Sequence, residues 1–154
     1  MKNALELADK YEGKVDKEVV ELGALLHDIA MPSEYGKREE HDIYGAKIAK
    51  QLLTELNYST DKIKHVENCV LNHRGLEERP RNTIEEQIVA DSDVISHFDS
   101  LPGMFRLAYK ENNLSVQDGA EFVKKKLERD FNKLSPRTQK ELKLRYENII
   151  KVLF

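Results

Sequence analysis

Cysteine, tryptophan, proline and glycine are all scarce in this sequence of 154 residues. It has one cysteine, no tryptophan, four prolines and seven glycines. The single cysteine, Cys69, excludes an internal disulfide and fits a reducing environment, so we expect a cytoplasmic protein. Because residues that break helices are rare, most segments can form uninterrupted helices.

Long apolar runs and a strong excess of one charge are also missing. No uncharged apolar run approaches the ~18 residues that a membrane-spanning helix needs, and we find no signal-peptide pattern. A net charge of −3 gives no general attraction to nucleic acid or to an anionic membrane. With 40% hydrophobic and 34% charged residues, the chain has the composition of a soluble globular protein. We expect one domain over residues 1–154, with its motifs in about 4–99 and a helical extension over about 100–154.

Hydrophobic residues recur at helical spacing in almost every segment, and no short segment alternates with a period of two. The sequence therefore predicts an all-α fold, a single compact bundle of seven to eight helices. Pro102 and Gly103 are expected to separate the fifth helix from the sixth. The predicted helices span residues 2–11, 16–30, 41–56, 61–73, 83–99, 104–111, 115–133 and 136–153.

Two features of the last helices concern the surface. The basic cluster Lys124, Lys125 and Lys126 lies opposite apolar residues of its helix, which predicts a solvated helix face. The final helix carries one apolar stripe, which either core packing or a contact between two copies in a homodimer would produce. The stripe consists of Leu142, Tyr146, Ile149, Ile150 and Leu153.

Histidines and aspartates that suit a metal site are spread over the first hundred residues. His27 and Asp28 end an apolar helical run, and His41, His73 and Asp93 follow. Imidazole and carboxylate are the ligands of hydrolytic metals such as Mn²⁺, Fe²⁺ and Zn²⁺. Adjacent side chains on a helix point about 100° apart, so His27 and Asp28 can both bind a metal only near a helix end or deep in a cleft.

The surroundings of these residues allow more than one interpretation. A lone histidine on an apolar face is most often a hydrogen-bonded core residue. Two small residues one turn before His27, Gly23 and Ala24, leave room beside its ring. Asp28 favours function, because a carboxylate in an apolar segment is costly unless it is charge-paired or bound to metal. His73 shares a helix face with apolar residues, which directs its ring toward the core.

Two aspartates compete for the last ligand position. Asp91 and Asp93 point roughly 160° apart on one helix, so a single ion is not expected to bind both. Asp91 falls in the apolar stripe of Ile84, Ile88 and Ile95, which indicates that Asp91 is the buried one. Periodicity alone therefore slightly favours Asp91 and leaves Asp93 open.

Four segments occur in a characteristic order and spacing. The first is LGALLHDI at residues 22–29, and the second is EEHDIYGAKIA, which contains His41. The third is VLNHRG, which contains His73, and the fourth is IVADSDVISHFDS. Over roughly residues 4–99 they resemble, in turn, the "AALLHDI" signature, the two further histidine elements and the closing "ADxL" element of the HD-domain superfamily of metal-dependent phosphohydrolases.

This resemblance implies a helical cleft that holds one or two divalent ions of Mn, Fe, Mg, Ni or Zn. His27, Asp28 and the closing aspartate would bind one ion. His41 and His73 would bind a second ion, with Asp28 as the bridge. Asp28, His41 and His73 would thereby carry the catalysis.

The same resemblance decides the order of preference between the two aspartates. In the family, the closing ligand has an apolar residue four positions before it and another two positions after it. Val89 and Ile95 give Asp93 this setting, so we choose Asp93 and keep Asp91 as the alternative.

The family also carries a histidine ligand on its first helix, and no histidine precedes His27 here. The sequence then either starts late or leaves the first ion with one ligand fewer.

Positively charged residues flank two of the candidate ligands. Lys37 and Arg38 stand just before the second histidine element, and Arg74, Arg79 and Arg81 follow the third. Guanidinium and ammonium groups bind phosphate, so we take Lys37, Arg38 and Arg74 as candidate substrate-binding residues. Ordinary solvated loop charge is the alternative.

The function implied by the resemblance is hydrolysis of a phosphate ester or anhydride, with a metal that activates water. We expect a small phosphorylated substrate, with a nucleotide as first choice. The alternatives are a di-iron oxygenase of HD type and a non-catalytic HD domain that binds a nucleotide or a partner.

Overall fold

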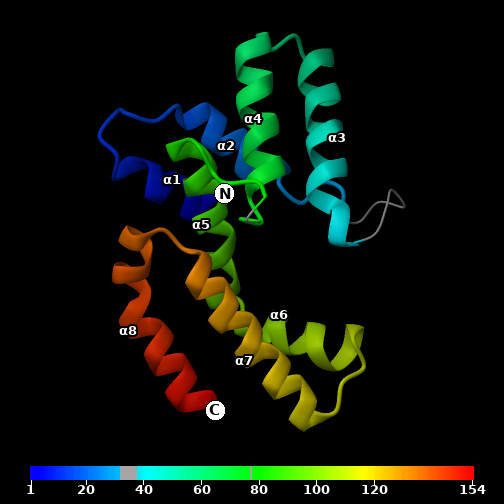
Figure 1. Cartoon of the computed structure of the whole chain (residues 1–154), viewed down its shortest axis with the longest axis vertical. Coiled ribbons are helices and arrows are strands. Elements are labelled where there is room, and N and C mark those ends of the chain that lie inside the picture. The colour runs from blue at the N-terminus through cyan, green and yellow to red at the C-terminus, as the bar shows by residue number, and fades with distance from the viewer. Residues whose placement is uncertain (32–37, 77) are drawn as a thin grey trace. The chain divides into compact units, whose positions relative to one another are not determined.

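The computed structural model describes residues 1–31, 38–76 and 78–154, and of Arg38 it describes the backbone alone. Within these ranges the chain forms eight α-helices and no β-strand (Figure 1). The prediction of an all-α fold is confirmed. Within the described ranges, every helix is too short or too polar to cross a lipid bilayer.

The bounds of the helices are as follows. The first five are α1 (Lys2–Asp9), α2 (Lys17–Leu26), α3 (His41–Glu55), α4 (Thr60–Asn72) and α5 (Ile84–Asp99). The last three are α6 (Leu101–Arg106), α7 (Val116–Lys133) and α8 (Pro136–Leu153). A 3-10 turn, Arg38–Glu40, precedes α3, and a π-helical segment, Leu107–Glu111, follows α6.

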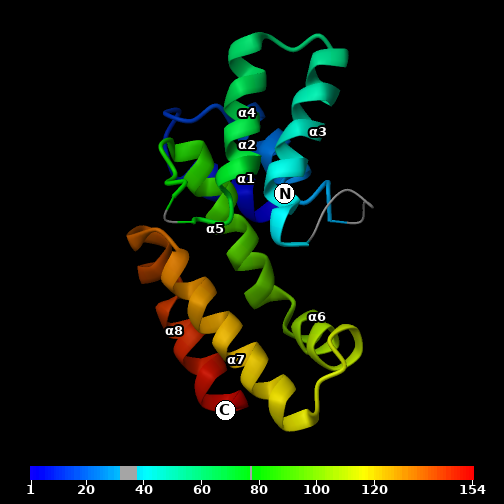
Figure 2. The same ribbon diagram turned by 45° about the vertical axis from the view of Figure 1, so that its right-hand side comes forward.

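The chain divides into two compact units, Met1–Asp93 and Val94–Phe154, with the boundary inside α5. Each unit has its own apolar core. In the first unit, α3 and α4 run side by side in opposite directions, as both ribbon views show (Figures 1 and 2). The expectation of a single domain over the whole chain stays a prediction.

The first core forms where α2, α4 and α5 approach closely. A Cβ atom added to Gly23 would lie 2.9 Å from Cys69 Cβ and 2.9 Å from Val89 Cγ2. Glycine at this position therefore brings the three helix backbones together. The sequence suggests that Gly23 leaves room beside the His27 ring. In the structure Gly23 instead leaves room for the neighbouring helices α4 and α5. The core residues of this unit are Val19, Leu26, Ala46, Ala49, Leu53, Ile63, Val66, Cys69, Val70 and Val89.

Several predicted helix limits differ from the structure. The first helix is expected to end at residue 11 but ends at Asp9, and two other limits differ by more. The second helix was expected to reach residue 30, but α2 ends at Leu26 and a turn begins with His27. The sixth was expected to start at residue 104, but α6 begins at Leu101 and contains Pro102 in its first turn. Proline is tolerated there because the first N–H groups of a helix have no partner inside the helix.

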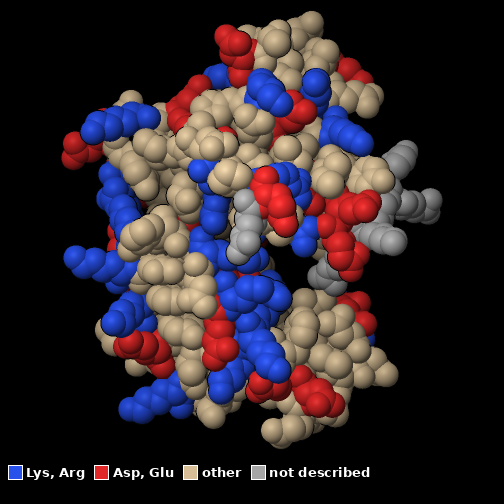
Figure 3. Space-filling view, in the orientation of Figure 1, with Lys and Arg blue, Asp and Glu red and all other residues tan. Residues whose placement is uncertain are grey.

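The second unit is built around α7 and α8. Leu142, Tyr146 and Ile149 of the last helix pack against its core. Core packing thus accounts for these three residues of the apolar stripe, and the homodimer stays a prediction. Figure 3 shows Lys and Arg side chains along α7, where Lys125 is exposed and Lys126 is half-buried.

Candidate metal centre

Helix ends deliver the three candidate histidines to one place in the first unit. His27 follows directly after α2, His41 is the first residue of α3, and His73 follows directly after α4. Asp28 lies in the turn after α2, and Asp93 lies within α5. The adjacent pair His27 and Asp28 therefore stands at a helix end, the location that allows both side chains to face one ion.

Asp28 and two histidines form a compact triangle of possible ligand atoms. Asp28 Oδ1 lies 3.2 Å from His41 Nε2 and 3.8 Å from His73 Nε2. The two Nε2 atoms are 3.2 Å apart. All three groups offer ligand atoms within 4.8 Å of one another.

The second oxygen of Asp28 faces a different histidine. Asp28 Oδ2 lies 3.6 Å from His27 Nε2, and Asp93 Oδ1 lies 3.5 Å from the same nitrogen. The Asp28 carboxylate thus stands between two groups of possible ligands. One group is His41 and His73, and the other is His27 and Asp93.

Backbone carbonyls fix the orientation of two imidazole rings. His27 Nδ1 lies 2.9 Å from the Ala24 carbonyl, and His73 Nδ1 lies 2.6 Å from the Val70 carbonyl. A carbonyl oxygen only accepts, so Nδ1 is the donor in each pair. In the neutral ring, Nε2 then keeps a lone pair and points toward Asp28. Hydrogen bonds of this type orient histidines that bind metals.

Burial and nearby charge set the proton affinities of these groups. For His73, burial dominates and places the pKa of the imidazole below its usual value. For His27, burial also lowers the pKa, but the hydrogen bond to Asp93 and the charge of Asp28 outweigh it and raise the pKa. Burial raises the pKa of Asp28, yet the neighbouring histidines bring it below the usual range. The group therefore combines ionised carboxylate with a neutral imidazole at His73.

These residues fit a divalent ion. Ligand atoms at bond lengths of about 2.1 Å around one ion lie roughly 3 Å from each other, close to the separations found here. Two carboxylates supply a charge that matches a divalent cation, and histidine with carboxylate suits Mn²⁺, Fe²⁺ or Zn²⁺. The side chain of His73 is 3% exposed and that of Asp28 is 47% exposed. The centre is thus closed on the His73 side and open beside Asp28.

Asp91 has a different environment from Asp93. It is 2% exposed, and its Oδ1 accepts a 2.8 Å hydrogen bond from Gln87 Nε2. Burial lowers the pKa of the Arg81 guanidinium, while the nearby Asp91 charge acts in the opposite direction. Asp91 is therefore the buried aspartate, as periodicity indicates, whereas Asp93 is the one beside His27.

The three candidate phosphate-binding residues differ in what the structure shows. Lys37 lies outside the described residues, and so does the side chain of Arg38. Arg74 Nη1 donates to Asp42 Oδ1 at 3.3 Å and also to the Glu39 carbonyl. The guanidinium of Arg74 is thus engaged with protein groups.

Asp42 is a residue near the centre that the sequence motifs do not single out. It is completely buried and pairs with Arg74 and Arg79. Burial raises the pKa of its carboxyl, but the two guanidinium groups outweigh this and hold the pKa below its usual value. Helical spacing in the sequence could have identified Asp42, because this residue shares the buried face of α3 with Ala46 and Ala49. A carboxylate on such a face needs a charged partner.

Comparison with known proteins gives two curated relatives and one family model. An uncharacterized protein of Clostridium beijerinckii is 30% identical over 59 residues, which cover 38% of this chain and 38% of that protein. An uncharacterized protein of Methanocaldococcus jannaschii is 34% identical over 96 residues, which cover 58% of this chain and 56% of that protein. The matched part thus spans about half the length, or less, of these curated relatives. No solved structure gives a significant match. The family model described as the HD domain matches residues 1–97, well over half of the sequence, and the chain therefore belongs to the HD-domain family.

Proposed function

We propose that this protein is a metal-dependent phosphohydrolase that cleaves a phosphate ester or anhydride of a small metabolite, with nucleotides as the first class to test. The observation that carries the proposal is the triangle of Asp28, His41 and His73, whose ligand atoms lie within 4.8 Å of one another. Membership of the HD-domain family supports it, because that family includes metal-dependent phosphohydrolases.

Asp28, His41 and His73 are the proposed ligands of one ion, and His27 with Asp93 and Asp28 are those of a second. The two oxygens of Asp28 favour this division, since each faces a different histidine. When bound, such ions supply Lewis acidity, which lowers the pKa of water and polarises a phosphoryl oxygen.

The protein groups themselves perform three tasks in this proposal. The Ala24 and Val70 carbonyls hold the His27 and His73 rings with Nε2 directed inward. Buried His73 closes one side of the centre to solvent. The half-exposed carboxylate of Asp28 marks the side from which substrate and water approach.

The test is phosphate release from a panel of nucleotides and small phosphate esters by protein reconstituted with Mn²⁺. Asp28→Ala should lower kcat/KM at least about a hundredfold, because a metal centre contributes several kcal/mol to the transition state. Asp61→Ala is the matched control, since Asp61 is an exposed aspartate in the first turn of α4, and it should retain full activity.

Retained phosphate release by Asp28→Ala, purified in the same way as the wild type, would contradict this mechanism. Two bound irons with redox-linked spectra, and no phosphate release from any substrate, would favour an oxygenase instead.

A further inference from the structure

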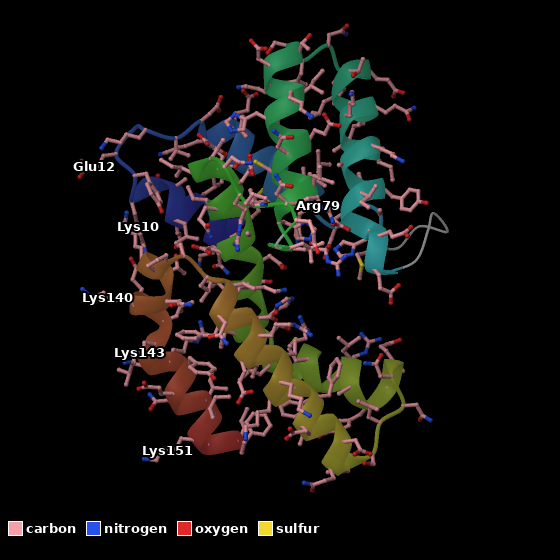
Figure 4. The ribbon with its side chains drawn as sticks, viewed as in Figure 1. Lys10, Glu12, Arg79, Lys140, Lys143 and Lys151 are labelled. Carbon is pink, nitrogen blue, oxygen red and sulfur yellow. The ribbon has the colours of Figure 1, made fainter. Side chains whose placement is uncertain are left out.

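A buried carboxylate links the beginning of α3 with the segment that follows α4. The Asp42 side chain is completely buried. Its Oδ1 accepts from Arg74 Nη1 at 3.3 Å, and its Oδ2 accepts from Arg79 Nη2 in a close contact. Figure 4 shows Arg79 between the end of α4 and the start of α3. We call these three residues the Asp42 clamp.

Both arginines of the Asp42 clamp also bind backbone carbonyls close to the candidate ligands. Arg74 donates to the carbonyl of Glu39, two residues before His41. Arg79 Nη1 donates to the carbonyl of Leu71 at 3.4 Å, two residues before His73. The clamp therefore holds the backbone on both sides of the gap between the two histidines.

His41 depends on such a connection because of its position in the chain. It is the first residue of α3, and among the described residues no side chain caps this helix at Glu40. The 3-10 turn Arg38–Glu40 leads directly into α3, so the position of His41 depends on this turn and on the segments that contact it. Asp42 also places a negative charge in the first turn, which the helix dipole favours.

We infer that Asp42 is a positioning residue that fixes His41 opposite His73 through Arg74 and Arg79, an inference that rests on the proposed function. The Asp42 side chain is buried against the two guanidinium groups and is not among the proposed ligands. It acts through the backbone next to each histidine, whose Nε2 atoms are 3.2 Å apart. Arg74, a candidate for phosphate binding by sequence, takes a positioning role in this arrangement.

Loss of the Asp42 charge should weaken metal binding more than it weakens the fold. In Asp42→Asn, an amide replaces the carboxylate, so one of the two guanidinium groups faces an N–H donor instead of an acceptor. Partners that orient metal ligands from behind typically contribute 10–100-fold in affinity. We expect the Mn²⁺ dissociation constant to rise about tenfold, since the effect passes through the backbone.

Asp130→Asn provides a matched control in the second unit. The Asp130 side chain is 4% exposed, and its Oδ2 lies 2.9 Å from both His97 Nδ1 and Lys126 Nζ. Asp130→Asn removes the charge of a buried ion pair, and none of the residues in that pair is a proposed metal ligand. If Asp42 contributed only to the stability of the fold, Asp42→Asn and Asp130→Asn would therefore change the Mn²⁺ dissociation constant to the same extent.

The experiment is a calorimetric titration of the metal-free protein with Mn²⁺. Urea unfolding curves, measured at the temperature of the titration, establish beforehand that each variant is fully folded without urea. The expected result is a dissociation constant about tenfold higher for Asp42→Asn and unchanged for Asp130→Asn. If Asp42→Asn fails to fold, Arg79→Gln replaces it in the test, because this variant keeps the pair of Asp42 with Arg74. Its Mn²⁺ affinity is expected to be several-fold weaker than that of the wild type.

The outcomes separate this inference from the proposed function. Equal Mn²⁺ affinities for the wild type and the folded clamp variant would overturn the positioning role while leaving the metal centre intact. Weakening of equal size in Asp130→Asn would also overturn it. A wild-type protein that binds no Mn²⁺ would contradict the proposed function, and with it this inference.

Discussion

Asp28 stands between two sets of histidine and carboxylate groups and presents one oxygen to each. Oδ1 faces His41 and His73, while Oδ2 faces His27. A carboxylate in this position would belong to both groups of proposed ligands. The chemistry proposed for this protein therefore depends on Asp28 more than on any single histidine.

The two neighbouring aspartates should behave differently when each is replaced. Asp93→Ala removes the oxygen 3.5 Å from His27 Nε2, and we expect metal affinity to fall at least tenfold. Asp91→Ala removes the acceptor of the Gln87 hydrogen bond and should lower the free energy of unfolding by about 1–3 kcal/mol with little effect on affinity. Mn²⁺ titration and urea unfolding of both variants measure the two effects. Metal loss in Asp91→Ala alone would reverse the assignment.

The sequence motifs select individual residues that lie close together in the structure. His41 and His73, for example, stand at helix ends and have their Nε2 atoms 3.2 Å apart. The motifs do not predict the partner of Arg74. An arginine beside a candidate ligand suits phosphate binding, but here it faces Asp42, 32 residues earlier in the sequence. Only the packing of α3 against α4 reveals this pair.

Helix ends are the elements that build the centre, and their limits are the weakest part of the sequence prediction. The apolar pattern continues through Ile29, yet α2 ends at Leu26. The reason lies in the side chain of His27, whose Nδ1 donates to the carbonyl of Ala24 while the backbone enters a turn. Periodicity records which residues are apolar and carries no information on this competing hydrogen bond.

Gly23 should be essential for the packing of α2 in the first unit. Gly23→Ala would place a methyl group 2.9 Å from Cys69 Cβ, so the helices must separate. Overpacking of this kind costs typically 1–3 kcal/mol, and the His27 end of α2 should shift with it. Urea unfolding measures the loss of stability, and Leu25→Ala, at an exposed position of the same helix, is the control. Because alanine is about 1 kcal/mol more favourable than glycine within a helix, a Gly23→Ala variant that is more stable than the wild type would contradict the close packing.

For the whole molecule, the sequence predicts the all-α class and the family, and it does so because the motifs occur in order over a long stretch. Residues 1–97 match the HD-domain model, and the candidate ligands all lie within Met1–Asp93. The sequence places the motifs in about 4–99 and a helical extension after them. The boundary between the two compact units lies inside α5, which continues across it without a break in its helical pattern. The second unit brings its own core and none of the proposed ligands.

Anomalous diffraction from crystals of the whole protein grown with Mn²⁺ tests the central claim most directly. It locates the ion without reference to any substrate, and it also shows whether one or two ions bind. We predict an anomalous peak within bonding distance of Asp28 Oδ1, His41 Nε2 and His73 Nε2. Crystals grown at saturating Mn²⁺ that show no ion at this position would contradict the account, whether or not Mn²⁺ is bound beside His27 and Asp93.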